Sequence, residues 1–186
     1  MKLALNHYNP KNKNRWNGYF PFLERDVANK EFFQLSRPLS DISDWERKGC
    51  PLYEKQPWPK NSKKLGLDQV LETFQEHHKR MHDLAMSLIQ SFATGLGKNK
   101  NYFDPWFKDE STAVFRGLHY LPRPSDVILE NPNDQKLVAP EHSDSGFITL
   151  LTTFMFPGLQ VLLDGEYRSI KSKKNAIVIN IGSTLQ

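Results

Sequence analysis

The sequence predicts an α+β protein, in which an irregular and helical N-terminal part is followed by a double-sheet jelly roll. Two observations support this class: one long helical pattern in the middle of the chain, and a series of short apolar segments separated by turn residues after it. Helices followed by a run of antiparallel strands are typical of α+β folds, and the jelly roll is a common arrangement of such strands.

The expected organisation has three regions that form effectively one domain. Residues 1–66 read as an irregular arm, rich in aromatic residues and in prolines that interrupt long elements. Residues 67–110 form a helical support, and residues 111–186 form the jelly roll. A chain of 186 residues is long enough for one domain with a sizeable core.

A long helix is predicted from Asp68 to about Leu96, because apolar residues recur there at three- and four-residue spacing. Asp68 is a suitable N-cap, and Gly95 or Gly97 ends the pattern. Residues 101–108 predict a short aromatic helical turn.

The C-terminal part predicts short strands rich in branched and aromatic residues. They are expected over residues 113–121, 137–144, 147–153, 159–163, 167–170 and 176–181. Asp164-Gly165 lies between two of these strands and indicates a tight hairpin.

The composition bears on the kind of binding partner and on the cellular compartment. The formal net charge is +4, but the basic residues are scattered in small groups, which does not indicate a nucleic-acid interface. No stretch is apolar enough to span a bilayer. The single cysteine, Cys50, cannot form an internal disulfide, so we expect a reducing, cytoplasmic location.

The most informative short stretch begins with His142-Ser143-Asp144. In an extended strand, residues two apart point to the same face, so the imidazole of His142 and the carboxylate of Asp144 would lie side by side. These are two of the three protein ligands of a two-His-one-carboxylate iron site. The alternative is an ordinary hydrogen-bonded pair.

A second histidine pair, His78 and His82, lies one helical turn apart in the predicted helix. This spacing resembles a zinc-binding helix, but Lys79 stands where that motif has its general-base Glu. A partly exposed histidine face is the alternative.

Motifs along nearly the whole chain resemble the non-haem iron(II), 2-oxoglutarate-dependent dioxygenases of the isopenicillin N synthase-like group. They are Asn17-Gly18-Tyr19-Phe20, Lys30-Glu31-Phe32-Phe33, Gln56-Pro57-Trp58-Pro59, Arg116-Gly117-Leu118-His119-Tyr120, His142-Ser143-Asp144, Gly158-Leu159-Gln160-Val161, Asp164-Gly165 and Asn180-Ile181-Gly182.

The resemblance implies that His142 and Asp144 bind Fe(II), and that Tyr120 helps to hold the carboxylate of the cosubstrate 2-oxoglutarate. A core tyrosine is the alternative for Tyr120. The chain departs from the family pattern at Leu118, Leu121 and Ser183, where an asparagine, a proline and an aspartate are common.

In this family, the second iron-binding histidine and an Arg-x-Ser pair follow the Asn-Ile-Gly strand, whereas this sequence stops at Gln186. The N-terminal strand and helix of the family also have no counterpart. The resemblance therefore implies an incomplete jelly roll, truncated at both ends.

The expected function is that of a dioxygenase that uses Fe(II), 2-oxoglutarate and dioxygen to oxidise a small organic substrate. Arg15 is a candidate contact for a substrate carboxylate, with a solvated arginine as the alternative. Two other functions stay open: an isopenicillin N synthase-like oxidase that uses no 2-oxoglutarate, and a non-catalytic jelly-roll fragment or pseudoenzyme.

Overall fold

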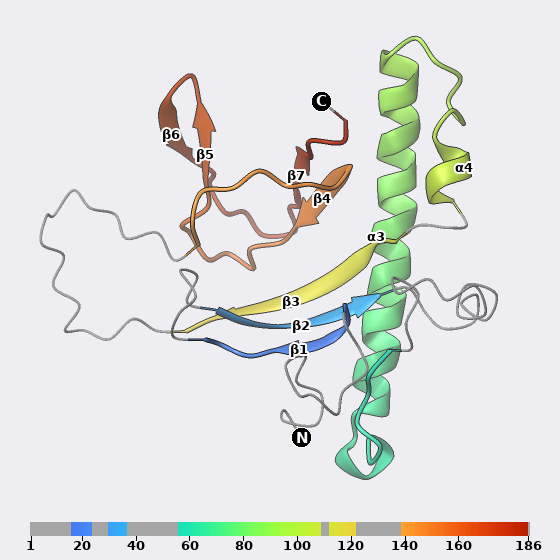
Figure 1. The fold of residues 1–186 in the computed structure, drawn as a ribbon, viewed down its shortest axis with the longest axis vertical. Coiled ribbons are helices and arrows are strands. Elements are labelled where there is room, and N and C mark those ends of the chain that lie inside the picture. Colours follow the sequence, from blue (N-terminus) through green and yellow to red (C-terminus); the bar gives the residue numbers. More distant parts are fainter. Residues whose placement is uncertain (1–15, 24–29, 37–55, 109–111, 122–138, 186) are drawn as a thin grey trace, which may run out of the picture. The chain divides into compact units, whose positions relative to one another are not determined.

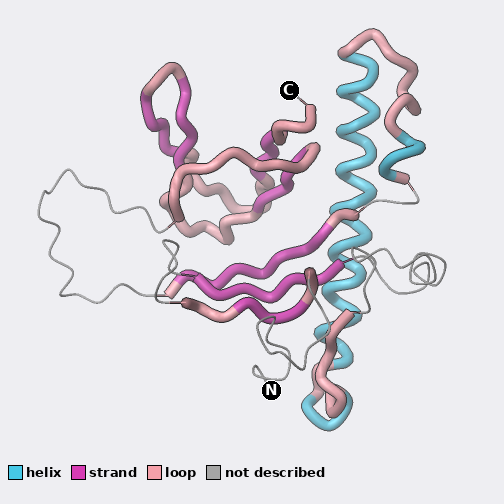
Figure 2. The backbone as a smooth tube through the Cα atoms, viewed as in Figure 1, coloured by secondary structure: helices cyan, strands magenta, loops and turns pink. Residues whose placement is uncertain are grey.

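The computed structural model describes residues 16–23, 30–36, 56–108, 112–121 and 139–185 (Figure 1). The chain divides into two compact units, residues 1–141 and 142–186. In the described residues, the first unit contains helices and strands, and the second contains only strands and loops (Figure 2). The boundary lies inside the region 111–186 that the sequence assigns to the jelly roll, and the three-region division stays a prediction.

Within the described residues, the sheet of the first unit has three antiparallel strands in the order β1-β2-β3. They are β1 (Gly18–Phe20), β2 (Lys30–Ser36) and β3 (Val114–Tyr120). Strand β3 confirms the strand predicted over residues 113–121. The arm expected to be irregular over residues 1–66 contains two strands that the prediction misses, because prolines such as Pro21 follow a strand instead of interrupting it.

One face of this sheet carries an apolar row of β2 side chains. Leu35 is 5% exposed and lies opposite Phe115 in the β2–β3 register. Phe33, two residues before Leu35 and on the same face, makes an edge-to-face contact with Trp58 at 5.9 Å between ring centroids. Phe33 and Leu35 therefore form an apolar row on one face of β2, with Leu35 buried and Phe33 partly exposed.

Helix α3 (Asp68–Gly95) confirms the predicted long helix. Its N-cap is Leu67, so the predicted capping role of Asp68 is wrong; Asp68 instead lies in the first turn, where its carboxylate is favourable to the helix dipole. The helix ends in a Schellman motif, in which the N–H groups of Gly97 and Lys98 donate to the carbonyls of Thr94 and Ala93, both at 2.9 Å. Gly97 allows this geometry because its φ is +70°.

Two shorter helical segments flank α3. The 3₁₀ segment η2 (Lys63–Leu65) precedes it, and α4 (Asp104–Phe107) follows it and confirms the aromatic turn predicted over residues 101–108. In the part of the chain that the structure describes, no helix combines the length and apolarity required to cross a membrane.

Helix α3 packs on the sheet through Phe115 of β3. The ring of Phe115 lies 5.3 Å from the ring of Phe74 and 5.2 Å from that of His77, measured between centroids. The Nε2 atom of His78 lies 3.2 Å from the carbonyl oxygen of Ala113, just before β3. These contacts anchor the N-terminal half of α3 to β3 and to the residue before it.

The second unit contains two antiparallel pairs of strands. Strand β4 (Ile148–Leu151) pairs with β7 (Val178–Ile181), and β5 (Gln160–Leu163) pairs with β6 (Glu166–Ser169). The predicted hairpin is confirmed: Asp164 and Gly165 connect β5 and β6 with φ values of +53° and +80°, as a type I′ turn requires.

The strand predicted over residues 137–144 is wrong for its described part, because residues 139–144 form no strand. The backbone around Asp144 bonds to the turn after β7 instead of to a β-ladder. This turn comprises Gly182, Ser183 and Thr184.

Candidate metal centre

The segment that carries Asp144 is held by hydrogen bonds to the turn after β7. The backbone N–H of Ser183 donates to the carbonyl of Asp144 at 2.9 Å, and that of Gly182 donates to the carbonyl of Phe147 at 2.9 Å. The hydroxyl of Thr184 donates to the carbonyl of Ser145 at 2.9 Å. The peptide groups around Asp144 are therefore fixed at several points, although no strand forms there.

His142 and Asp144 bring an imidazole and a carboxylate together. The Nε2 atom of His142 lies 3.7 Å from Oδ1 of Asp144. The side chain of His142 is 63% exposed and that of Asp144 is 30% exposed. The side-by-side placement predicted from the sequence is confirmed, but a loop produces it and not a strand.

The second carboxylate oxygen of Asp144 accepts two hydrogen bonds. The hydroxyl of Thr149 donates to Oδ2 at 2.6 Å, and the side-chain amide of Asn180 donates to the same oxygen at 2.7 Å. Thr149 and Asn180 are direct partners in the β4–β7 register. The carboxylate therefore directs Oδ2 to the sheet and Oδ1 to the imidazole.

The donor set fits part of an iron(II) site. Imidazole nitrogen and carboxylate oxygen are both ligands in two-His-one-carboxylate centres. Among the described residues, no three side chains of His, Cys, Asp or Glu are grouped so that they could hold a metal. His142 and Asp144 thus match two ligands of such a centre.

Thr149 and Asn180 were not predicted as site residues. Their contact with Asp144 depends on the pairing of β4 with β7, between residues about thirty positions apart in the sequence. The Asn-Ile-Gly motif marks Asn180 as notable, but the motif does not indicate which group its amide contacts.

The histidine pair on α3 has a structural role in the first unit. The rings of His78 and His82 stack with 6.5 Å between centroids, and Nε2 of His78 faces the carbonyl oxygen of Ala113. A nitrogen that bonds to a backbone carbonyl carries its proton and is not available as a metal ligand. The geometry favours the alternative of a partly exposed histidine face.

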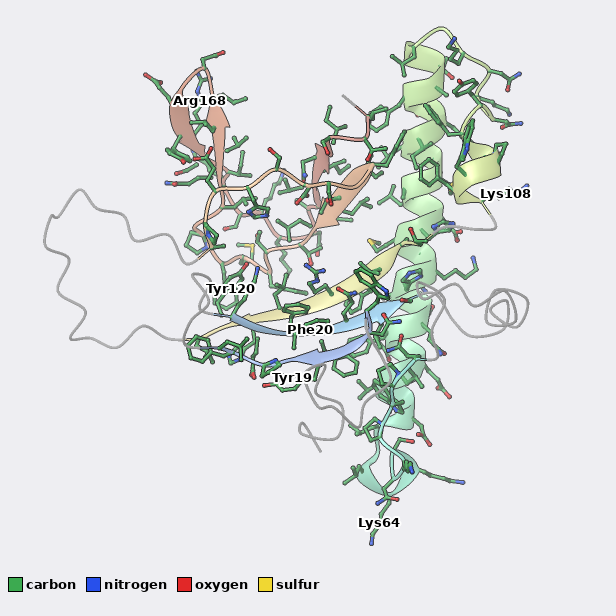
Figure 3. The ribbon with its side chains drawn as sticks, in the orientation of Figure 1. Tyr19, Phe20, Lys64, Lys108, Tyr120 and Arg168 are labelled. Carbon is green, nitrogen blue, oxygen red and sulfur yellow. The ribbon has the colours of Figure 1, made fainter. Side chains whose placement is uncertain are left out.

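Tyr120 is the last residue of β3 in the first unit, and it lies opposite Lys30 of β2 (Figure 3). The residue is 47% exposed, which does not support the alternative of a core tyrosine. The role of Tyr120 as a 2-oxoglutarate contact stays a prediction. Arg15 lies outside the described residues, and so does Cys50.

Comparison with known proteins finds similarity to one superfamily of oxygenases and to individual oxidative enzymes. The profile of the 2OG-Fe(II) oxygenase superfamily matches residues 112–186. The isopenicillin N synthase of Amycolatopsis lactamdurans is 28% identical over 185 residues, which cover 98% of this chain and 56% of that protein. Gibberellin 20 oxidase 2 of Arabidopsis thaliana is 30% identical over 117 residues, which cover 63% of this chain and 29% of that protein.

A solved structure shows the same fold. Full-length Neurospora crassa T7H in complex with alpha-KG superposes with a TM-score of 0.73 at 25% identity, over 99% of this chain and 51% of that one. The chain spans about half the length of this structure and of the isopenicillin N synthase above.

These matches establish the jelly-roll fold class and agree with the expected cofactors, Fe(II) and 2-oxoglutarate, the latter being the alpha-KG of the T7H complex. The matched region includes Tyr120, His142 and Asp144. Residues 112–186 match the 2OG-Fe(II) oxygenase superfamily, and the chain as a whole is similar to isopenicillin N synthases and to the T7H structure.

Proposed function

We propose that this chain carries part of the active site of an iron(II)- and 2-oxoglutarate-dependent dioxygenase that oxidises a small organic substrate. The observation that supports the proposal most directly is the 3.7 Å approach of His142 Nε2 to Asp144 Oδ1 within the segment matched by the superfamily profile. An isolated surface pair would not require the set of hydrogen bonds that holds Asp144.

In this proposal, His142 and Asp144 would hold the iron. Bound iron(II) supplies the activation of dioxygen, which in this family is coupled to the decarboxylation of 2-oxoglutarate to succinate. The few protein ligands of such a site leave positions for the cosubstrate and dioxygen. Asp144 contributes the negative charge, and Tyr120 would donate a hydrogen bond from its hydroxyl to a carboxylate of 2-oxoglutarate.

A second candidate is an oxidase that resembles isopenicillin N synthase, uses no 2-oxoglutarate and closes rings on a thiol-containing peptide. It is favoured by the isopenicillin N synthase match, which covers 98% of this chain. The first candidate is favoured by the alpha-KG-bound T7H structure. The same His142 and Asp144 would hold iron in both cases.

The test is an anaerobic iron(II) titration of the protein from the full reading frame that encodes this chain, followed by addition of dioxygen and 2-oxoglutarate. Iron binding with succinate release supports the dioxygenase. Iron binding without succinate release, combined with oxidation of a thiol-containing tripeptide, would support the second candidate. A protein that binds no iron would contradict both and favour the non-catalytic alternative.

A further inference from the structure

The β4–β7 strand pair ends beside the carboxylate of Asp144. Thr149 on β4 and Asn180 on β7 face each other across the ladder, and both side chains donate to the same oxygen, Oδ2. The two distances, 2.6 Å and 2.7 Å, are those of well-formed hydrogen bonds. Two donors from two strands meet on one carboxylate oxygen.

This arrangement determines the orientation of the carboxylate. A carboxylate rotates about its Cβ–Cγ bond, and one hydrogen bond would leave much of that freedom. Two donors from different strands fix both the position of Oδ2 and the plane of the group. The other oxygen, Oδ1, then lies on the side of His142, 3.7 Å from Nε2.

The chemistry of the donors suits this task. A threonine hydroxyl and an asparagine amide are neutral, so they orient the carboxylate without cancelling the negative charge that a cation requires. The branched Thr149 side chain also has few rotamers in a strand, which keeps its hydroxyl directed at Oδ2. A lysine or arginine at either position would compete with a metal for the charge of Asp144.

We propose that Thr149 and Asn180 are positioning residues for the metal ligand Asp144. They hold Oδ2 at the sheet, so that Oδ1 and the Nε2 atom of His142 are presented together to the cation. This inference rests on the proposed function, because it assigns the two donors a role at the same metal site.

The experiment measures cobalt(II) affinity and the visible spectrum of the cobalt(II) complex, using the protein from the full reading frame. Cobalt(II) is stable in air, and its absorption bands report the coordination number. Residues that orient a metal ligand typically contribute 10–100-fold to metal affinity. We therefore expect Thr149→Val and Asn180→Ala each to weaken cobalt binding by about 10–100-fold and to alter the spectrum.

Two further variants separate positioning from a general structural effect. Thr149→Ser retains the hydroxyl and should restore both affinity and spectrum. Thr152→Val, placed just after β4 and away from Asp144 in the sequence, makes the same chemical change and should leave both unchanged. Circular dichroism of every variant checks that the fold is retained, and β4–β7 pairing itself uses backbone groups that these changes keep.

The outcomes distinguish this inference from the proposed function. Wild-type affinity and spectrum in both Thr149→Val and Asn180→Ala would overturn the positioning role and leave the metal site intact. Failure of Thr149→Ser to restore the spectrum would also overturn it. If the unmodified protein binds neither iron(II) nor cobalt(II), the proposed function fails, and the positioning role fails with it.

Discussion

Gly182 lies directly against the backbone of Gly146. A Cβ atom added to Gly182 would come within 2.0 Å of the Gly146 carbonyl oxygen and 3.0 Å of the Asp144 carbonyl oxygen. The absence of a side chain at Gly182 therefore allows the turn after β7 to approach the segment that carries Asp144.

Gly182→Ala is expected to separate these two backbones. The added Cβ would clash with the peptide group of Gly146, which cannot move without breaking neighbouring hydrogen bonds. Overpacking of this kind costs about 1–3 kcal/mol of stability. Urea denaturation should show this loss in the free energy of unfolding, and iron(II) affinity should fall because Asp144 moves. Gly146→Ala is the matched control, since a Cβ there meets nothing within 4 Å, and it should change much less. Equal effects of the two substitutions would contradict the proposed close approach.

Removal of either proposed metal ligand should abolish iron(II) binding. His142→Ala deletes the nitrogen donor and Asp144→Ala deletes the anionic donor, so neither variant retains the pair that the structure brings together. Isothermal titration calorimetry under anaerobic conditions measures the iron(II) affinity of each variant. His82→Ala, which removes a histidine of the α3 stack, should bind iron as the unmodified protein does. Unchanged iron content in His142→Ala or Asp144→Ala would refute the ligand assignment.

The β5–β6 hairpin should depend on Gly165 more than on Asp164. Gly165 has a φ of +80°, and a side chain in the left-handed region costs roughly 1–2 kcal/mol. Thermal unfolding of Gly165→Ala should show a loss of about this size. Asp164→Asn should be almost neutral, because asparagine tolerates a positive φ and the exposed Asp164–Arg168 pair, at 3.9 Å, contributes little. A larger loss for Asp164→Asn than for Gly165→Ala would contradict this assignment.

The N-terminal sheet should depend on Gln34, which is 6% exposed. Its Oε1 atom accepts hydrogen bonds from Arg116 Nε at 3.0 Å and Arg116 Nη2 at 2.6 Å, and its Nε2 donates to the carbonyl of Trp16. Gln34→Met keeps the size of the side chain and removes these bonds, which should cost about 1–3 kcal/mol of unfolding free energy. The same change at the exposed Gln69 serves as control. A neutral Gln34→Met would show that the network does not stabilise the sheet.

Local sequence patterns were sufficient where the structure depends on near neighbours. The spacing of apolar residues predicted α3 almost to its ends, and Asp164-Gly165 predicted the hairpin turn, because both elements are determined by contacts a few residues apart. The same reasoning missed β1 and β2. A strand is stabilised by pairing with another strand, and β3, which pairs with β2, lies far along the sequence and begins at Val114.

The candidate metal centre was likewise predictable from the sequence only in part. The two-residue spacing of His142 and Asp144 was enough to predict that their side chains lie together, even though the segment is a loop. Only the tertiary structure decided which atoms hold the carboxylate. Thr149 and Asn180 meet at Oδ2 because β4 pairs with β7, and Gly182 approaches Gly146 because the turn after β7 folds back on the Asp144 segment. Such contacts depend on long-range backbone pairing, whereas the sequence alone determines the residue types that the pairing brings together.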